Sequence, residues 1–177
     1  KSVAKVLKLT PEHISAYSLI VEDHTPLAEN PELLSLLPGE ETDRKMYHYT
    51  KRMLSAMGYE RYEISNYARS GYACRHNIGY WTGRAYLGFG AGAASYYKRE
   101  RFRNTEQPIM NYLRETKAVL TEKDRIEEFM FLGLRMMRGV SEDDFFERFH
   151  VMMDAIYGTV LKKYESEGFL IRDAGRI

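Results

Sequence analysis

Apolar and polar positions in the first half of the chain alternate between short apolar runs and amphipathic helical segments. Residues 13–21 (HISAYSLIV) are apolar on both alternating faces, a pattern typical of a strand that is buried on two sides. An apolar stripe at helical spacing over residues 42–57, followed by Gly58, predicts a helix. Residues 61–65, within YERYEIS, and residues 86–95 (YLGFGAGAAS) are predicted to be two further strands. This order of strand, helix and strand predicts an α/β fold with mainly parallel strands.

The pattern becomes helical towards the end of the chain. Residues 121–139 open with a Thr-x-x-Asp cap, residues 141–149 open with a Ser-x-x-Asp cap, and residues 153–166 form a third predicted helix. The segment Phe-Leu-Ile that follows is predicted to be a short strand. Three helices and the start of a strand indicate a winged-helix-like module whose wing is cut off at Ile177. The pattern fits a plain helical appendage equally well.

The patterns divide the chain into an expected α/β part, residues 1–118, and a helical part, residues 119–177. Acidic and basic residues nearly balance, 25 against 26, so neither nucleic acid nor anionic lipid is an expected partner. No apolar run approaches the roughly 20 residues that a membrane-spanning helix requires. Cys74 is the only cysteine, which favours a cytoplasmic protein without disulfides. Because an iron–sulfur cluster is held by several thiolates, the chain alone is not expected to bind one.

Residues 73–95 gather the most unusual side chains of the sequence. His76 follows Cys74 by two positions, but one Cys-x-His pair is too small for a structural zinc site, which needs four ligands. Tyr80 and Trp81 are suited to stacking on a flat ligand, and the small residues of GFGAGAAS would let a bulky ring approach the backbone. A plainer interpretation also fits, with an ordinary hydrogen-bonding histidine, a small buried cysteine and aromatics that belong to the core.

A polar string, Glu63, Ser65, Asn66 and Tyr67, lies at the end of the second predicted strand. Binding sites of α/β proteins gather at the ends of their strands, which makes this string a candidate. Strand residues that simply face solvent would look the same.

Four blocks of the sequence resemble, in order, the oxygen-independent coproporphyrinogen III oxidase-like family of radical S-adenosylmethionine proteins. The blocks are HISAYSLIVEDHTPL, MYHYTKRMLSAMGYERYEISNYARSGYACRHNIGYW, YLGFGAGAAS and EEFMFLGLRMMRGV. The resemblance runs from about residue 10 to residue 170. It implies the back half of a partial (β/α) barrel followed by the C-terminal helical domain of the family. The family's Cys-x-x-x-Cys-x-x-Cys loop belongs to the front half, which this chain lacks.

One branch of the family resembles a heme chaperone and carries the motif His-Asn-x-x-Tyr-Trp. Here the motif is intact as His76, Asn77, Tyr80 and Trp81. The resemblance implies a heme-binding segment, in which His76 would be an axial ligand of the iron and the aromatics would pack on the macrocycle. Gly79 predicts a turn at this point, which would leave the histidine free to reach a ligand. Heme-accepting apoproteins are the partners that this branch implies.

The other branch decarboxylates coproporphyrinogen III to protoporphyrinogen IX with radicals made from S-adenosylmethionine. Two strand-end positions that touch S-adenosylmethionine in that branch correspond to Ile20 and Ala94. The cluster and S-adenosylmethionine are expected only together with the front half of the protein. One departure from the family is His24, which stands where a glycine is usual and offers a second imidazole.

The sequence therefore predicts the C-terminal portion of a heme-chaperone-like radical S-adenosylmethionine protein of porphyrin metabolism, with no catalytic residue of its own. The alternative is an oxygen-independent coproporphyrinogen III oxidase, and the intact motif favours the chaperone. A nucleic-acid-binding winged helix is disfavoured, because the helix over residues 153–166 mixes Lys162 and Lys163 with Asp154 and Glu165 and has no basic stripe.

Overall fold

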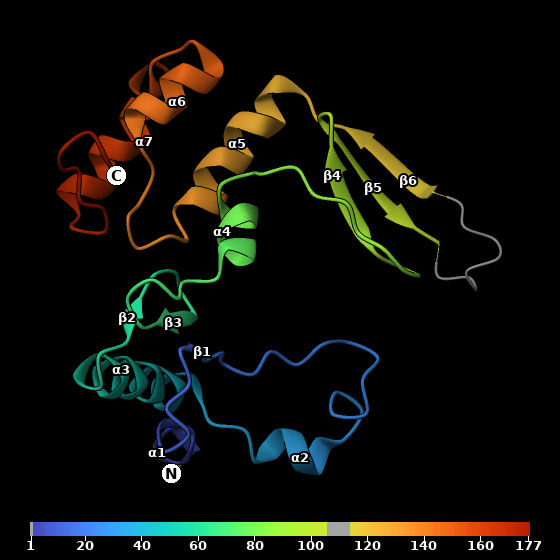
Figure 1. Cartoon of the computed structure of the whole chain (residues 1–177), viewed down its shortest axis with the longest axis vertical. Coiled ribbons are helices and arrows are strands. Elements are labelled where there is room, and N and C mark those ends of the chain that lie inside the picture. Colours follow the sequence, from blue (N-terminus) through green and yellow to red (C-terminus); the bar gives the residue numbers. More distant parts are fainter. Residues whose placement is uncertain (1, 106–113) are drawn as a thin grey trace. The chain divides into compact units, whose positions relative to one another are not determined.

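The structure, a computed structural model, describes residues 2–105 and 114–177 and consists of two compact units, Lys1–Cys74 and Arg75–Ile177 (Figure 1). Each unit has its own buried cluster of apolar side chains. The structure thus divides the chain after Cys74, whereas the sequence placed a domain boundary after residue 118. The boundary after residue 118 stays a prediction. No helix in the described part of the chain is long and apolar enough to cross a membrane.

The first unit packs helices against a small antiparallel sheet. Its elements are α1 (Ser2–Leu7), β1 (His13–Ser15), α2 (Pro31–Ser35), α3 (Glu40–Ala56), β2 (Glu60–Arg61) and β3 (Asn66–Ala68). The strand β3 lies in the middle of the sheet, and both β1 and β2 pair with it antiparallel. Leu7, Leu54, Tyr59 and Tyr67 form the buried centre of this unit.

Helix α3 confirms the helix predicted from the apolar stripe. It begins after Gly39, carries three acidic residues in its first turn, and ends where Gly58 adopts a φ of +80°. Acidic side chains favour the positive end of the helix dipole, and glycine adopts the left-handed backbone without a steric cost. These local signals explain why the helix was predictable from sequence.

The predicted sheet of mainly parallel strands is wrong, because every strand pairing between described residues is antiparallel. Of the predicted strand over residues 61–65, only Arg61 is strand, and residues 62–65 connect β2 to β3. The cause is Glu63, whose buried carboxylate accepts hydrogen bonds from the backbone of Ser65 (2.8 Å) and from Nδ2 of Asn66 (2.6 Å). Residues 16–21 are not strand either, and Leu19 and Ile20 are largely exposed.

The second unit combines a three-stranded meander with four helices. Its elements are α4 (Arg75–Trp81), β4 (Ala94–Tyr97), β5 (Glu100–Asn104), β6 (Arg114–Val119), α5 (Glu122–Gly133), α6 (Glu142–Phe149) and α7 (Met153–Ser166). The sheet order is β4-β5-β6. The predicted strand over residues 86–95 is thus replaced by β4, which begins at Ala94, and by a single bridge between Tyr86 and Tyr96.

The helical part confirms the predicted caps. Thr121 and Asp124 form a reciprocal capping box at the start of α5, and the Ser141 hydroxyl accepts a hydrogen bond from the backbone of Asp144 at the start of α6. Helix α7 has the predicted bounds. Helix α5, however, ends at Gly133 rather than at Gly139.

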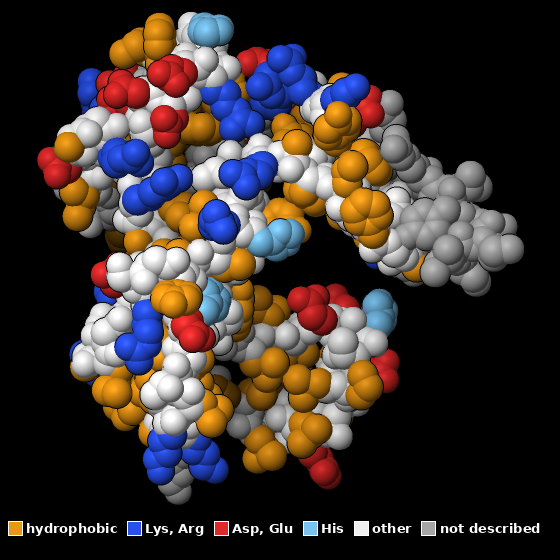
Figure 2. Space-filling view, in the orientation of Figure 1, with side chains coloured by type: hydrophobic (Ala, Val, Ile, Leu, Met, Phe, Trp, Pro, Cys, Tyr) orange, Lys and Arg blue, Asp and Glu red, His pale blue; other side chains and the backbone are white. Residues whose placement is uncertain are grey.

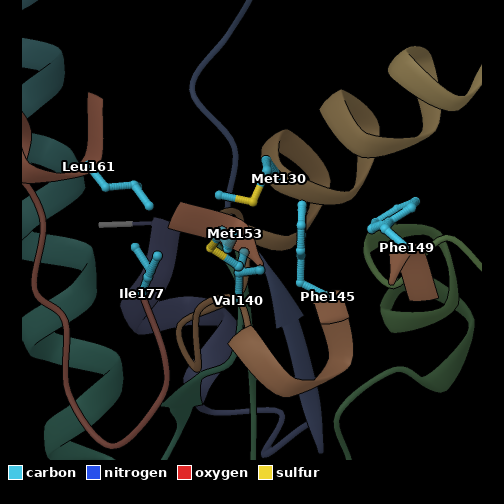
Figure 3. Close-up of a cluster of buried hydrophobic side chains, with 7 residues drawn as sticks. All are labelled: Met130, Val140, Phe145, Phe149, Met153, Leu161 and Ile177. Carbon is cyan, nitrogen blue, oxygen red and sulfur yellow. The ribbon is translucent and has the colours of Figure 1, made fainter. Parts of the chain in front are cut away.

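Seven side chains from the last three helices, the connection between α5 and α6, and the C-terminal end form the core of the second unit (Figure 3). They are Met130, Val140, Phe145, Phe149, Met153, Leu161 and Ile177. The predicted Phe-Leu-Ile strand is absent from this described segment. The end of the chain instead returns to the start of α6, where Val140 and Ile177 exchange backbone hydrogen bonds of 2.8 and 2.9 Å. A Cβ on Gly139 would lie 2.0 Å from the Ile177 carbonyl oxygen, so this contact requires glycine.

Candidate functional site

Helix α4 carries all four residues of the His-Asn-x-x-Tyr-Trp motif. The turn predicted at Gly79 is wrong, because the helix runs without a break from Arg75 to Trp81. The buried Gly79 has another use: the side-chain stem of Arg84 packs where a Cβ would project, with Cδ 3.6 Å and Cβ 3.7 Å from that position. A hydrogen bond of 2.8 Å from the Arg84 backbone to the Gly79 carbonyl closes the end of the helix.

His76 and Tyr80 lie one turn apart on the same face of α4. His76 is exposed, and its ring meets the half-buried Tyr80 ring edge to face, with centroids 4.8 Å apart and planes at 81°. Tyr80 makes the same kind of contact with Tyr86, at 4.6 Å and 79°. We call His76, Gly79 and Tyr80, together with the packed Tyr86 and Arg84, the His76 face.

Trp81 lies on a different side of α4, because five residues of helix rotate the side chain by about 140° from His76. Its ring is covered by the guanidinium of Arg135, 4.4 Å from the ring centroid. The indole Nε1 is buried and finds no hydrogen-bond acceptor in the described part of the chain. With Phe129 and Met136, Trp81 lines a pocket of about 460 Å³ within the second unit. His76 and Tyr80 of the motif therefore lie on one side of α4, and Trp81 lies on another.

At Gly88, the glycine-rich segment after α4 leaves no room for a ring, and the room expected beside its other small residues stays a prediction. A Cβ on Gly88 would lie 2.3 Å from the Ala94 carbonyl oxygen, so the chain itself fills this space. The Ser95 hydroxyl accepts a hydrogen bond from the Gly88 backbone, and Asn104 Nδ2 donates to the carbonyls of Gly88 and Gly90. The small residues thus allow the close approach of this segment to β4 and β5.

The remaining predicted site residues lie apart in sequence from the motif. Ile20 belongs to the first unit and is 75% exposed, whereas Ala94 is the exposed first residue of β4 in the second unit. Cys74 is a half-buried free thiol. His24 adopts a φ of +60°, a backbone conformation that favours glycine. Among the described residues, no group of three or more His, Cys, Asp or Glu side chains could hold a metal ion.

A buried polar network in the first unit was visible in the sequence only as a polar string. Glu63 and Asn66 are fully buried, and Asn66 accepts a hydrogen bond of 2.5 Å from the Ser15 hydroxyl and donates one of 3.2 Å to the Tyr17 hydroxyl. Burial raises the pKa of the neighbouring Tyr67 hydroxyl. The network ties β1 to β3 and therefore has a structural role, which spacing alone did not reveal.

Comparison with solved structures defines the fold class. The chain matches coproporphyrinogen III oxidase (HemN) from Escherichia coli, a radical SAM enzyme, with a TM-score of 0.70. The match covers 98% of this chain and 45% of that chain at 14% sequence identity. The fold is therefore that of part of HemN.

Sequence comparison then gives the family. Residues 120–177 match the family model described as the HemN C-terminal domain. The chain is 37% identical to the heme chaperone HemW of Lactococcus lactis, over 99% of this chain and 48% of the relative, and 38% identical to HemW of Bacillus subtilis, over 96% and 47%. It thus spans about half the length of these relatives. The chain belongs to the HemN/HemW family and represents its C-terminal portion.

Proposed function

We propose that this chain is the heme-binding portion of a radical S-adenosylmethionine protein that binds heme and delivers it to apoproteins. The observation that carries the proposal is the exposed His76 on α4, held edge to face against Tyr80. Neutral imidazole is a common axial ligand of heme iron, and one such ligand needs no cluster of metal-binding side chains. The heme-chaperone name of the relatives agrees with this assignment.

In this proposal the residues of the motif have different tasks. His76 ligates the iron through a ring nitrogen, and Tyr80 limits the rotation of the imidazole while its own ring offers an apolar surface to the macrocycle. Trp81 anchors α4 through its contact with Arg135, because its ring lies on another side of the helix. Asn77 belongs to the heme-binding segment by its place in the motif.

The remaining assignments extend the same proposal to the whole protein. An iron–sulfur cluster would be held by cysteines that this chain does not supply. S-adenosylmethionine would bind together with that cluster, and Ile20 and Ala94 would be the positions that touch it. Residues 119–177 would be the winged-helix-like domain, in a cytoplasmic protein. A coproporphyrinogen III oxidase would have a related fold, but the motif on α4 favours the chaperone.

The test is a heme titration of the chain, followed by the Soret absorbance band. His76→Ala is expected to shift the band and to weaken heme binding about tenfold or more, since a lost iron–ligand bond is worth more than about 1.4 kcal/mol. His48→Ala is the matched control, because His48 is an exposed histidine on α3. Equal affinity and an unchanged Soret position for His76→Ala would overturn the ligand assignment.

A further inference from the structure

Arg84 adds a cation to the His76 face, and its place is fixed by its own packing. Its side-chain stem lies on Gly79 at ordinary van der Waals distance, and its backbone donates to the Gly79 carbonyl. Arg84 is exposed, and its guanidinium makes no hydrogen bond or ion pair with any residue in the described ranges. The stem of this arginine is held in place by packing, and its guanidinium has no partner among the described residues. Such a guanidinium can bind an anion from outside the chain.

The stem of this side chain lies on the same side of α4 as the histidine. Gly79 and Tyr80 follow His76 by three and four residues, so both positions are neighbours of His76 on the helix surface. The tyrosine pair Tyr80 and Tyr86 adds an apolar aromatic surface to this face. One surface thus combines an imidazole, aromatic rings and a guanidinium, whereas Trp81 and Arg135 occupy another side of α4.

We propose that Arg84 binds a propionate carboxylate of heme when His76 ligates the iron, and so selects a metalloporphyrin that carries free carboxylates. The inference rests on the proposed heme-binding function and adds the group that recognises the edge of the macrocycle. The guanidinium fork suits a carboxylate, with which it forms paired hydrogen bonds. Because the site is exposed, the contact is sensitive to salt.

The experiment compares heme with heme dimethyl ester, whose esterified propionates carry no charge, as ligands of the full chain. Arg84→Gln is expected to raise the dissociation constant of heme about threefold to fivefold, the range of an exposed ion pair, and to leave that of the ester unchanged. The Soret position of the heme complex should stay that of the wild type, because His76 is intact. Arg138→Gln, at an exposed arginine beyond the end of α5, is the control and should change neither constant.

Each outcome separates this inference from the function on which it rests. Equal weakening of heme and ester by Arg84→Gln would mean that Arg84 only supports the fold of the site, and unchanged heme binding would exclude any contact with a propionate. Loss confined to Arg138→Gln would place the carboxylate contact at Arg138 instead of Arg84. If the wild-type chain gives no Soret complex, the proposed heme-binding function fails, and the role of Arg84 fails with it.

Discussion

The ring of Tyr80 stands edge to face against the ring of His76, one helical turn away, with 4.8 Å between the centroids. The pairing matters because an exposed histidine otherwise rotates freely, whereas a ligand of heme iron must present its nitrogen along one direction. Tyr86 supports Tyr80 from behind at 4.6 Å, so the orientation of the imidazole depends on a short series of tyrosines that the second unit supplies. The proposed ligand is thus part of a preorganised surface rather than an isolated side chain.

Replacement of Tyr80 should therefore affect heme binding more than replacement of Trp81. Tyr80→Leu removes the aromatic contact and is expected to weaken heme binding about twofold to tenfold, the value of an aromatic pair. Trp81→Leu removes the contact with Arg135 and is expected to lower the free energy of unfolding by about 1–3 kcal/mol while heme affinity stays within about twofold. Heme titration and urea unfolding measure the two effects. Loss of heme binding in a folded Trp81→Leu variant would contradict the division of the motif between two surfaces.

Gly88 provides a second test, because its lack of a side chain serves the fold rather than a ligand. An added Cβ would lie 2.3 Å from the Ala94 carbonyl, so Gly88→Ala is expected to lower the free energy of unfolding by about 1–3 kcal/mol. Phe89→Ala is the control, since Phe89 is 89% exposed and its loss should cost no more than about 0.5 kcal/mol. A Gly88→Ala variant of unchanged stability that binds heme poorly would restore the earlier interpretation of this segment as space for a ring.

The parts of the fold that were predictable from sequence are those set by local interactions. The caps of α5 and α6 depend on side chains three residues apart, and the end of α3 depends on Gly58, so the sequence pattern carries this information directly. Strand pairing depends on distant partners. The pattern of residues 61–65 is typical of a strand. The carboxylate of Glu63, however, accepts hydrogen bonds from the backbone of Ser65 and the side chain of Asn66, and these hold the chain in a turn.

The local geometry of the candidate site was predictable only in part. His76 and Tyr80 of the motif lie together, whereas the turn predicted at Gly79 is absent. The common ligand expected for His76 and Trp81 stays a prediction. Near the end of the helix that separates Trp81 from His76, Gly79 accommodates the stem of Arg84. That contact depends on where the chain goes after α4, which periodicity does not encode.

The capping box at the start of α5 should give the second unit a defined acid dependence. Hydrogen bonds from the Thr121 hydroxyl (2.7 Å) and backbone (2.8 Å) hold the pKa of the Asp124 carboxyl below its usual value. Because the pKa is lower in the folded state, the stabilisation is present above the unfolded pKa near 4 and is lost as the pH falls through the lower folded value. Thr121→Ala should raise the pKa of Asp124 towards its unfolded value and cost about 0.5–2 kcal/mol at neutral pH.

A carbon-13 NMR titration of the Asp124 carboxyl measures this pKa directly. Thr159→Ala, at an exposed threonine on α7, should leave the titration of Asp124 as in the wild type. If the midpoint of Asp124 is the same with and without the Thr121 hydroxyl, the capping box does not form in solution.

His24 should carry a backbone strain that glycine relieves. Its φ of +60° costs a residue with a Cβ roughly 1 kcal/mol, and the turn is held by Thr25, whose hydroxyl donates to the Glu22 carbonyl at 2.7 Å. His24→Gly is therefore expected to raise the free energy of unfolding by up to about 1 kcal/mol, whereas His24→Ala keeps the Cβ and should give no gain. Urea unfolding followed by circular dichroism compares the three proteins, and heme titration should give the same affinity for each. If both variants weaken heme binding in equal measure, the imidazole of His24 is a second heme contact, and its strained backbone serves the ligand rather than the loop.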